Sequence, residues 1–263
     1  MTVACNLLVT SRGNWFMREV AELFAAALTD AGAPSTVVVD RVPAPQAGTV
    51  DIVVAPHEFF VVGPTLTPDQ RDAMLATRAV LTTEQPGSPW WPVQRPAVEA
   101  AALVLDVSAL AVAAHELEGT TALHAAIGYH PSLDRWGGDD RERPVDLCFL
   151  GGSTERRLSI LSTFAPLLSH RESRLLLHDP QVPVTGPGPY FLVGDDRRDL
   201  LASSKILLNV HREQSGYFEW FRAIDAFANG AVLLTEASRD HDPLVPSAHF
   251  VQSDAEHLAN HSK

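Results

Sequence analysis

The sequence has only two cysteines and no hydrophobic run long enough to cross a membrane. Cys5 and Cys148 both lie in short apolar segments of the 263-residue chain, which favours two buried thiols over a disulfide or a metal site. No segment approaches the roughly 20 apolar residues of a transmembrane helix. The N-terminus also lacks the basic start and the apolar length of a signal peptide. We therefore expect a cytoplasmic protein without a membrane span.

Basic residues are in the minority, and the common catalytic motifs are missing. The chain has 20 Lys and Arg against 32 Asp and Glu, for a net charge of −12. This balance argues against nucleic acid or an anionic membrane as the main partner. The absence of a GxxxxGK[ST] motif disfavours an ATPase, and the absence of H-E-x-x-H and C-x-x-C predicts no metal site.

Short aliphatic runs alternate with helical patterns throughout the first half of the chain. Such runs are typical of strands buried on both faces of a parallel sheet. A helix is expected over 14–32, with Asn14 as a possible N-cap and Gly32 as a stop. Strands are expected at 3–10, 36–40, 51–56, 79–84 and 103–108, and further helices at 67–76 and 108–119.

A polar segment, PSLDRWGGDDRERP (131–144), interrupts this alternation with two glycines, two prolines and seven charged residues. The alternation then restarts with strands near 146–152, 173–179, 205–210 and 231–236, and a helix is expected over 153–170. We therefore predict an α/β fold with two Rossmann-like domains facing a cleft. The predicted domains are 1–135 and 145–263, joined by a linker at 136–144.

Polar residues follow three predicted strands of the second half, where parallel sheets bind ligands. GGSTERR offers close backbone approach at Gly151 and Gly152, a helix cap at Ser153, and cations at Arg156 and Arg157. As residues of a first helical turn, both arginines are expected to be exposed. A helix N-terminus with arginines suits an anion, although an ordinary solvated helix start is the alternative. The other two strand ends contribute His178, His211 and Arg222.

Three segments resemble a known family: DLCFLGGSTERRLSIL, KILLNVH and FEWFRAIDAFANGAVLLTE. They are similar to the donor domain of group-1 glycosyltransferases of the GT-B fold, especially the spore-maturation-type branch. EQPGSPWW, LDVS and IGYHPSLDRW add weaker matches in the first half. The resemblance implies that a nucleotide-diphosphate sugar binds the C-terminal domain as donor substrate, with no tightly bound cofactor, and that an acceptor binds the N-terminal domain.

The resemblance also implies roles for single residues. Glu219 would lie near the donor sugar as a catalytic carboxylate, and Asp225 would hold the ribose. The amides of Gly216, Tyr217 and Phe218 would point toward the diphosphate. Five residues separate the two carboxylates, whereas many members of the family have seven. Compared with the family, we also expect a short or missing C-terminal extension.

Candidates for the acceptor side follow predicted strands of the first half. They are Gly13, Asn14, His57, Glu58, Glu84 and Trp90. The resemblance implies transfer with retention, in which the leaving phosphate helps to remove the acceptor proton. If the enzyme inverts, His57 or Glu84 is the candidate base.

The expected reaction is transfer of a hexose to a hydroxyl of a saccharide or small-molecule acceptor. Residue usage rich in Ala, Val and Arg is typical of actinobacterial chains. Because such chains often carry out mannosyl transfer, this usage favours GDP-mannose as the donor. Two alternatives stay open: a non-catalytic nucleotide-sugar binding protein and an NAD-dependent oxidoreductase. The absence of a GxGxxG motif disfavours the oxidoreductase.

Overall fold

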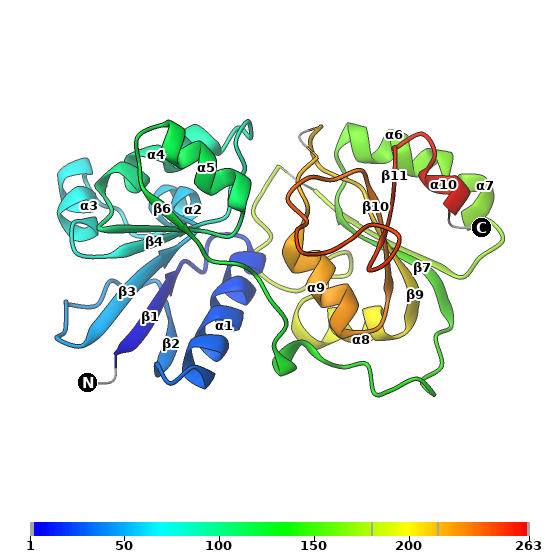
Figure 1. Ribbon diagram of the computed structural model, residues 1–263, viewed down its shortest axis with the longest axis horizontal. Coiled ribbons are helices and arrows are strands. Elements are labelled where there is room, and N and C mark those ends of the chain that lie inside the picture. Colours follow the sequence, from blue (N-terminus) through cyan, green and yellow to red (C-terminus); the bar gives the residue numbers. More distant parts are fainter. Residues whose placement is uncertain (1–2, 180, 215, 262–263) are drawn as a thin grey trace. The chain divides into compact units, whose positions relative to one another are not determined.

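The computed structural model describes residues 3–179, 181–214 and 216–261. The chain forms two compact units. Unit 1 comprises Met1–Ser132 and Pro183–Thr185, and unit 2 comprises Leu133–Val182 and Gly186–Lys263. Each unit contains one parallel sheet with helices against it (Figure 1). The predicted α/β fold with two Rossmann-like domains is confirmed.

The described strands of unit 1 form a parallel sheet in the order β2-β1-β3-β4-β5-β6. Leu8 on the central strand pairs with Val38 on one side and Val53 on the other. The bounds are β1 (Ala4–Val9), β2 (Ser35–Val39), β3 (Thr49–Val54), β4 (Ala79–Thr82), β5 (Leu103–Asp106) and β6 (Ala122–His124).

Helices cover both faces of this sheet. Figure 1 shows α1 (Trp15–Asp30) on one side and the other helices of the unit on the opposite side. These are α2 (Pro56–Val62), α3 (Pro68–Leu75), α4 (Trp91–Ala100) and α5 (Ala109–Leu117). Phe59, Leu75 and Val98 from three of them pack on Val53 and Val80 of the strands. Burial of this apolar surface stabilises the layer.

Three helix boundaries of unit 1 have local causes in the sequence, whereas the predicted cap at Asn14 does not act as one. Gly32 follows α1 with φ of +91°, a conformation that glycine adopts without steric cost. Thr67 forms a capping box with Gln70 before α3, and Ser108 accepts a hydrogen bond from the Ala111 amide before α5. Asn14 occupies the cap position of α1, but its side chain makes no capping bond there.

Three elements of unit 1 escape the sequence pattern: α2, α4 and β6. α4 carries Pro92 in its first turn, where no amide hydrogen is required, and a second proline at Pro96. Prolines ordinarily indicate a loop, which explains why this segment was not expected to be helical. The other two elements are only seven and three residues long.

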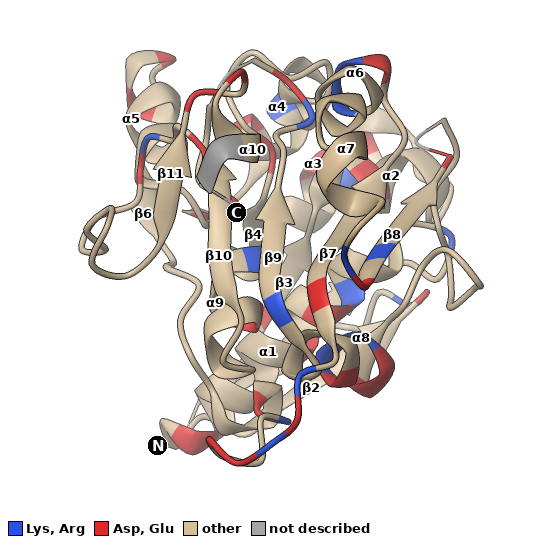
Figure 2. Cartoon of the chain, turned by 90° about the vertical axis from the view of Figure 1, so that its right-hand side faces the viewer, with Lys and Arg blue, Asp and Glu red and all other residues tan. Residues whose placement is uncertain are grey.

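Unit 2 has a parallel sheet in the order β11-β10-β9-β7-β8. Figure 2 shows β9, β7 and β8 side by side with their arrowheads at the same end. The bounds are β7 (Val145–Gly152), β8 (Ser173–His178), β9 (Ser204–Asn209), β10 (Val232–Glu236) and β11 (Val251–Ser253). The short β11 was not expected.

Helices also pack on both faces of this second sheet. Leu201 of α8 and Ala226 of α9 pack on one face, and Leu161 of α6 and Leu258 of α10 on the other. The predicted helix over 153–170 is broken at Phe164, ahead of Pro166. The bounds are α6 (Glu155–Thr163), α7 (Ala165–Leu168), α8 (Gly194–Ala202), α9 (Trp220–Ala228) and α10 (Leu258–His261), and a 3-10 turn spans Pro131–Leu133.

The polar segment that contains the predicted linker packs on unit 2 at the end of α9. Asn229 accepts a hydrogen bond from the Arg135 amide (2.8 Å) and donates one to the Leu133 carbonyl (3.0 Å). Arg143 donates to the Gly230 carbonyl, and a Cβ at Gly230 would collide with Arg143 and Trp136. The polar segment is therefore fixed to unit 2.

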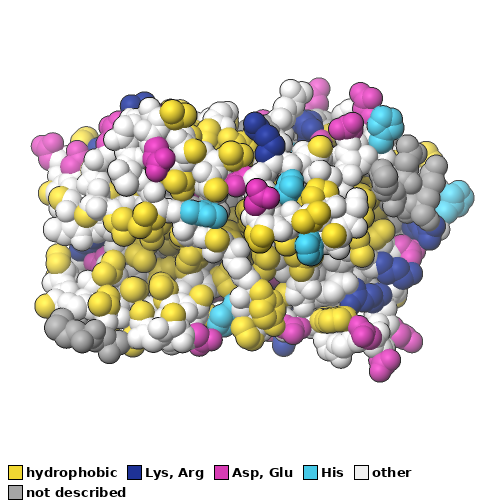
Figure 3. All heavy atoms as spheres, in the orientation of Figure 1, with side chains coloured by type: hydrophobic (Ala, Val, Ile, Leu, Met, Phe, Trp, Pro, Cys, Tyr) yellow, Lys and Arg dark blue, Asp and Glu magenta, His cyan; other side chains and the backbone are white. Residues whose placement is uncertain are grey.

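The surface retains several large hydrophobic side chains. Val50, Leu103 and Leu123, on β3, β5 and β6, are 39–53% exposed. Figure 3 shows hydrophobic side chains gathered over the strands of unit 1. No helix in the described part of the chain is both long and apolar enough to span a membrane.

Candidate functional site

Charged residues gather where the strands of unit 2 end. Arg156 and Arg157 lie in the first turn of α6, Glu219 and Arg222 at the start of α9, and Glu236 at the end of β10. We call these five residues the arginine cluster. Their formal charges, three positive and two negative, leave a surplus of one positive charge.

Arg156 is held by Glu236. Its Nη1 donates to Glu236 Oε2 (2.8 Å) and to the His211 carbonyl oxygen (2.8 Å), and its Nη2 pairs with Glu236 Oε1. Glu236, only 4% exposed, also accepts a hydrogen bond from the His211 amide (2.6 Å). The hydrogen bonds to Glu236 raise the pKa of Arg156. This two-pronged pair fixes the guanidinium at the strand end.

Arg157 is buried and Arg156 is half-buried, so the expectation that both arginines are exposed is wrong. Arg157 is 5% exposed; its Nε donates to the Val210 carbonyl oxygen (2.9 Å), and its Nη2 lies 3.4 Å from Glu219 Oε1. Burial lowers the pKa of Arg157 to about 10. A Cβ at Gly151 would lie 3.0 Å from Nη1. Glycine there leaves room for the guanidinium to cross the end of β7.

Glu219 lies beside two arginines and a histidine. Arg222 Nε donates to its Oε2 (2.9 Å), and His211 Nδ1 lies 3.6 Å from its Oε1. Burial alone would raise the pKa of Glu219, but Arg222, His211 and Arg157 hold that pKa well below its usual value. Glu219 is therefore ionised. It precedes α9 as the N-cap residue and makes no side-chain capping bond.

His178, at the end of β8, is half-buried beside the arginine cluster. Burial lowers its pKa, and the cations Arg157 and Arg222 lower it further. Its Nδ1 has no hydrogen-bond partner among the described residues. Ser153 donates to the His178 carbonyl from both its amide (2.9 Å) and its hydroxyl (3.1 Å). Ser153 therefore does not cap α6, and Thr154 does so instead.

The predicted direction of the Gly216–Phe218 amides is wrong at Phe218. Its amide donates to the Arg239 carbonyl (3.0 Å), and the Arg239 amide donates back to the Gly216 carbonyl (2.7 Å). Tyr217 and Phe218 are 7% and 4% exposed, and Phe218 belongs to the hydrophobic core. This segment therefore anchors the start of α9 to the unit.

Asp225 is 2% exposed and faces α8. Its Oδ2 lies 2.7 Å from Arg197 Nε, and its Oδ1 lies 3.4 Å from Arg198 Nε. These pairs join α9 to α8. The ribose role of Asp225 stays a prediction.

In unit 1, His57 and Glu84 come together after β3 and β4. His57 Nε2 lies 3.2 Å from Glu84 Oε1, and Glu84 Oε2 accepts a hydrogen bond from the Ser88 hydroxyl (2.8 Å). His57 is 2% exposed, and burial lowers its pKa to about 4. The imidazole is therefore neutral at pH 7. Its Nδ1 has no partner among the described residues.

The backbone turns sharply to place His57. Ala55 has φ of +50° directly before α2, a left-handed conformation that costs a residue with a Cβ about 1–2 kcal/mol. Its amide donates to the Leu81 carbonyl (2.9 Å), and its carbonyl accepts from the Phe59 amide (3.0 Å). The Trp90 ring, 40% exposed, has its centroid 6.1 Å from that of His57. Backbone strain of this kind is frequent at functional sites.

Gly13 and Asn14, which follow β1, form one cluster with Glu58 of α2. Glu58 Oε2 accepts from the Asn14 amide (2.7 Å), and Oε1 accepts from the Asn14 side chain. Burial raises the pKa of Glu58. Asn14 Oδ1 accepts from the Val184 amide (3.0 Å). The side chain of Asn14 therefore bonds Glu58 and Val184 instead of capping α1.

Gly13→Ala is expected to destabilise unit 1, because the added Cβ would collide with Glu58 Oε2. Overpacking of this size costs about 1–3 kcal/mol. Thermal melting of Gly13→Ala, Glu58→Ala and the double variant measures the coupling. Gly13→Ala should cost clearly less once Glu58 is alanine, and equal costs in both backgrounds would disprove the contact as the cause.

The described residues include no group of three or more His, Cys, Asp or Glu side chains that could hold a metal ion. Cys5 and Cys148 are free and buried, as predicted. Burial raises the pKa of Cys148 to about 11, so this thiol is protonated at neutral pH.

No family model and no curated protein sequence matches the chain. Solved structures match it in fold. An α1,3-fucosyltransferase matches at a TM-score of 0.50 and 12% identity, over 99% of this chain and 78% of its own. AviGT4, a glycosyltransferase involved in avilamycin A biosynthesis, matches at 0.53 and 14%, over 99% and 86%. An α-glucosyltransferase in complex with UDP and a 13-mer DNA containing a central A:G mismatch matches at 0.52 and 7%, over 99% and 88%. The chain thus shares the two-domain fold of these glycosyltransferases.

Glu236 is the member of the arginine cluster that the sequence did not point out. It is the last residue of the strand AVLLTE. Because ligands bind at the carboxyl ends of parallel strands, its position could have identified it as a site residue. The other members of the cluster, and the pair of His57 with Glu84, were among the predicted site residues.

Proposed function

We propose that the chain is a glycosyltransferase that moves a hexose from a nucleoside-diphosphate sugar to a hydroxyl of a saccharide or small-molecule acceptor. The observation that supports this function best is the arginine cluster, with its surplus positive charge at the carboxyl edge of a parallel sheet. The shared fold adds support, because all three reported neighbours are glycosyltransferases and one was solved with UDP.

The cluster suits the charge that develops during transfer. Cleavage of the glycosyl–phosphate bond leaves negative charge on the diphosphate, which Arg156, Arg157 and the N-terminus of α6 would stabilise. Glu219 and Glu236 hold the guanidinium groups in place before the donor binds. Positioned cations of this kind lower the barrier without reorganising during the reaction.

We propose His57 as the base that removes the acceptor proton. Glu84 beside Nε2 favours the tautomer with its proton on that nitrogen, which leaves the Nδ1 lone pair to accept a proton. A protein base supports transfer with inversion. The family resemblance instead implied retention, in which the leaving phosphate takes the proton. The effect of removing His57 separates these two mechanisms.

The identity of the donor's nucleotide and sugar is the more specific part of the proposal. Residue usage favours GDP-mannose, whereas the UDP of one structural neighbour favours a uridine nucleotide. We propose no resident cofactor, and the nucleotide sugar enters as substrate.

A thermal-shift panel of GDP, UDP, ADP and NAD tests the donor class. A nucleoside diphosphate at a hundred times its Kd should stabilise the fold by about 2.7 kcal/mol. For a chain of this size that corresponds to roughly 5–10 °C in Tm. Stabilisation by NAD alone would overturn the proposal in favour of an oxidoreductase. Diphosphate binding without hydrolysis or transfer of any nucleotide sugar would favour a binding protein.

A further inference from the structure

The loop that carries Glu84 joins β4 to α4. Two buried side chains, Asp106 and His115, hold the two ends of this loop. At its start, the Thr82 hydroxyl donates to Asp106 Oδ2 (2.5 Å). Asp106 is fully buried at the end of β5, and its Oδ1 accepts from the Ser108 amide (2.8 Å). His115 of α5, 2% exposed, has Nε2 3.3 Å from Asp106 Oδ2.

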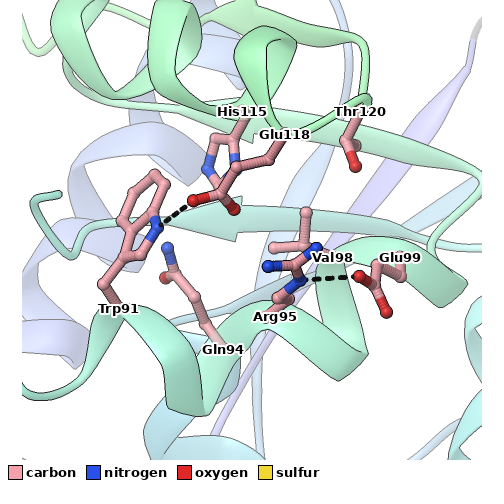
Figure 4. A pocket seen from close by; sticks show the side chains of 8 residues that line it. All are labelled: Trp91, Gln94, Arg95, Val98, Glu99, His115, Glu118 and Thr120. Atoms are coloured by element: carbon pink, nitrogen blue, oxygen red, sulfur yellow. Dashed lines mark hydrogen bonds and ion pairs between the residues drawn. The ribbon is translucent and has the colours of Figure 1, made fainter.

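The end of the loop contacts His115 of this pair through Trp91. The Trp91 ring stacks on the His115 ring, with centroids 4.4 Å apart and planes at 25°. Trp91 Nε1 also donates to Glu118 Oε1 (3.0 Å) (Figure 4). In the same view the side chain of Gln94, 1% exposed, extends from α4 into the pocket that Trp91 and His115 line. Trp91 is therefore held on its ring face and at its indole nitrogen.

Inside the loop, Ser88 joins the end of the loop to Glu84. Its hydroxyl donates to Glu84 Oε2 (2.8 Å) and accepts from the Trp91 amide (3.2 Å). The contacts therefore run without a break from Asp106 through His115, Trp91 and Ser88 to Glu84.

We infer that Asp106 and His115 are positioning residues, which fix the Glu84 loop so that Glu84 meets His57 and water is kept from the imidazole. This inference rests on the proposed role of His57 as base. The burial of both side chains makes the arrangement rigid, because a charged or polar group removed from water must keep its partners.

The inference predicts how a loosened loop changes His57. Glu84 faces His57 at Nε2, Trp90 lies near its ring, and the neighbouring Glu58 is occupied by Asn14. Since burial is what lowers the pKa of His57, water entering beside the ring should raise that pKa toward the ordinary value of about 6.5.

The test is an NMR titration of the His57 ring in the full chain, without donor or acceptor. His115→Phe keeps a ring for Trp91 to stack on but loses the contact with Asp106, and Asp106→Asn keeps the shape but weakens the same contact. Both variants should raise the pKa of His57 by about one unit or more. Leu75→Ala, a core truncation in α3, is the matched control for lost stability and should leave the titration unchanged.

An unchanged His57 titration in the folded His115→Phe variant would overturn the inference, as would an equal shift in Leu75→Ala. Should Asp106→Asn fail to fold, His115→Phe alone decides. The titration needs no transfer activity, so its failure is distinct from that of the proposed function, which the nucleotide panel reports.

Discussion

Replacing His57 with glutamine is expected to lower the rate of sugar transfer by about 10²–10⁴, the usual contribution of a general base. The reason is that His57 is neutral, is held at Nε2 by Glu84 and keeps Nδ1 without a described partner. Steady-state kinetics with a nucleotide sugar give the measurement. Donor KM should change little, because the proposed donor contacts belong to other residues.

His170→Gln is the matched control, since it changes an exposed histidine of unit 2 and should leave the rate unchanged. A His57→Gln rate close to that of the wild type would support retention and remove His57 from the mechanism.

The same variant should flatten the dependence of stability on pH. The folded pKa of His57 is about 4, below the ordinary value of 6.5. Between these values the unfolded chain binds a proton that the folded chain does not, so stability is present above pH 6.5 and is lost as the pH falls toward 4. The loss amounts to about 3 kcal/mol. Denaturant melts of wild type and His57→Gln at several pH values measure the difference.

Arg157→Met is expected to weaken the binding of a nucleoside diphosphate roughly 10–100-fold, because one charge-assisted contact contributes about 1.5–3 kcal/mol. The variant should also lose about 1–3 kcal/mol of stability, since the Val210 carbonyl would lose its donor. Calorimetric titration and melting on the same preparation separate the two effects.

Arg174→Met is the control for Arg157→Met. Arg174 lies on β8 with an exposed side chain and pairs with Glu172. The Arg174→Met variant should therefore match the wild type in nucleotide affinity and in melting temperature. A stable Arg157→Met protein that binds the diphosphate normally would place the phosphate site elsewhere.

The fold was predictable because its strands are short aliphatic runs between helical patterns, as in TVVVD and KILLNV. A local signal such as Gly32, the predicted stop of α1, also acted as expected. The sequence was least informative at two prolines, whose effects on the helices differ. Pro96 lies inside a helix, and Pro166 divides an otherwise continuous amphipathic segment.

The site was predictable as a list of strand-end residues but not as a set of contacts. Periodicity cannot show that Arg157 turns inward, because its burial depends on the absence of a side chain at Gly151 and on the carbonyl of Val210. Nor can it show that Asp225 pairs with Arg197 from another helix. The pairing of His57 with Glu84 likewise needs two neighbouring strands to end at the same level.

The polar segment before β7 bears on how the two halves of this gene could be separated or exchanged. Leu133, Arg135 and Arg143 bond to Asn229 and Gly230 at the end of α9. A recombination point at Val145 would therefore remove these partners of α9. A chimaera should exchange the halves ahead of Leu133 and carry this segment along. Its glycines and prolines are typical of a spacer, but its contacts make it part of the second module.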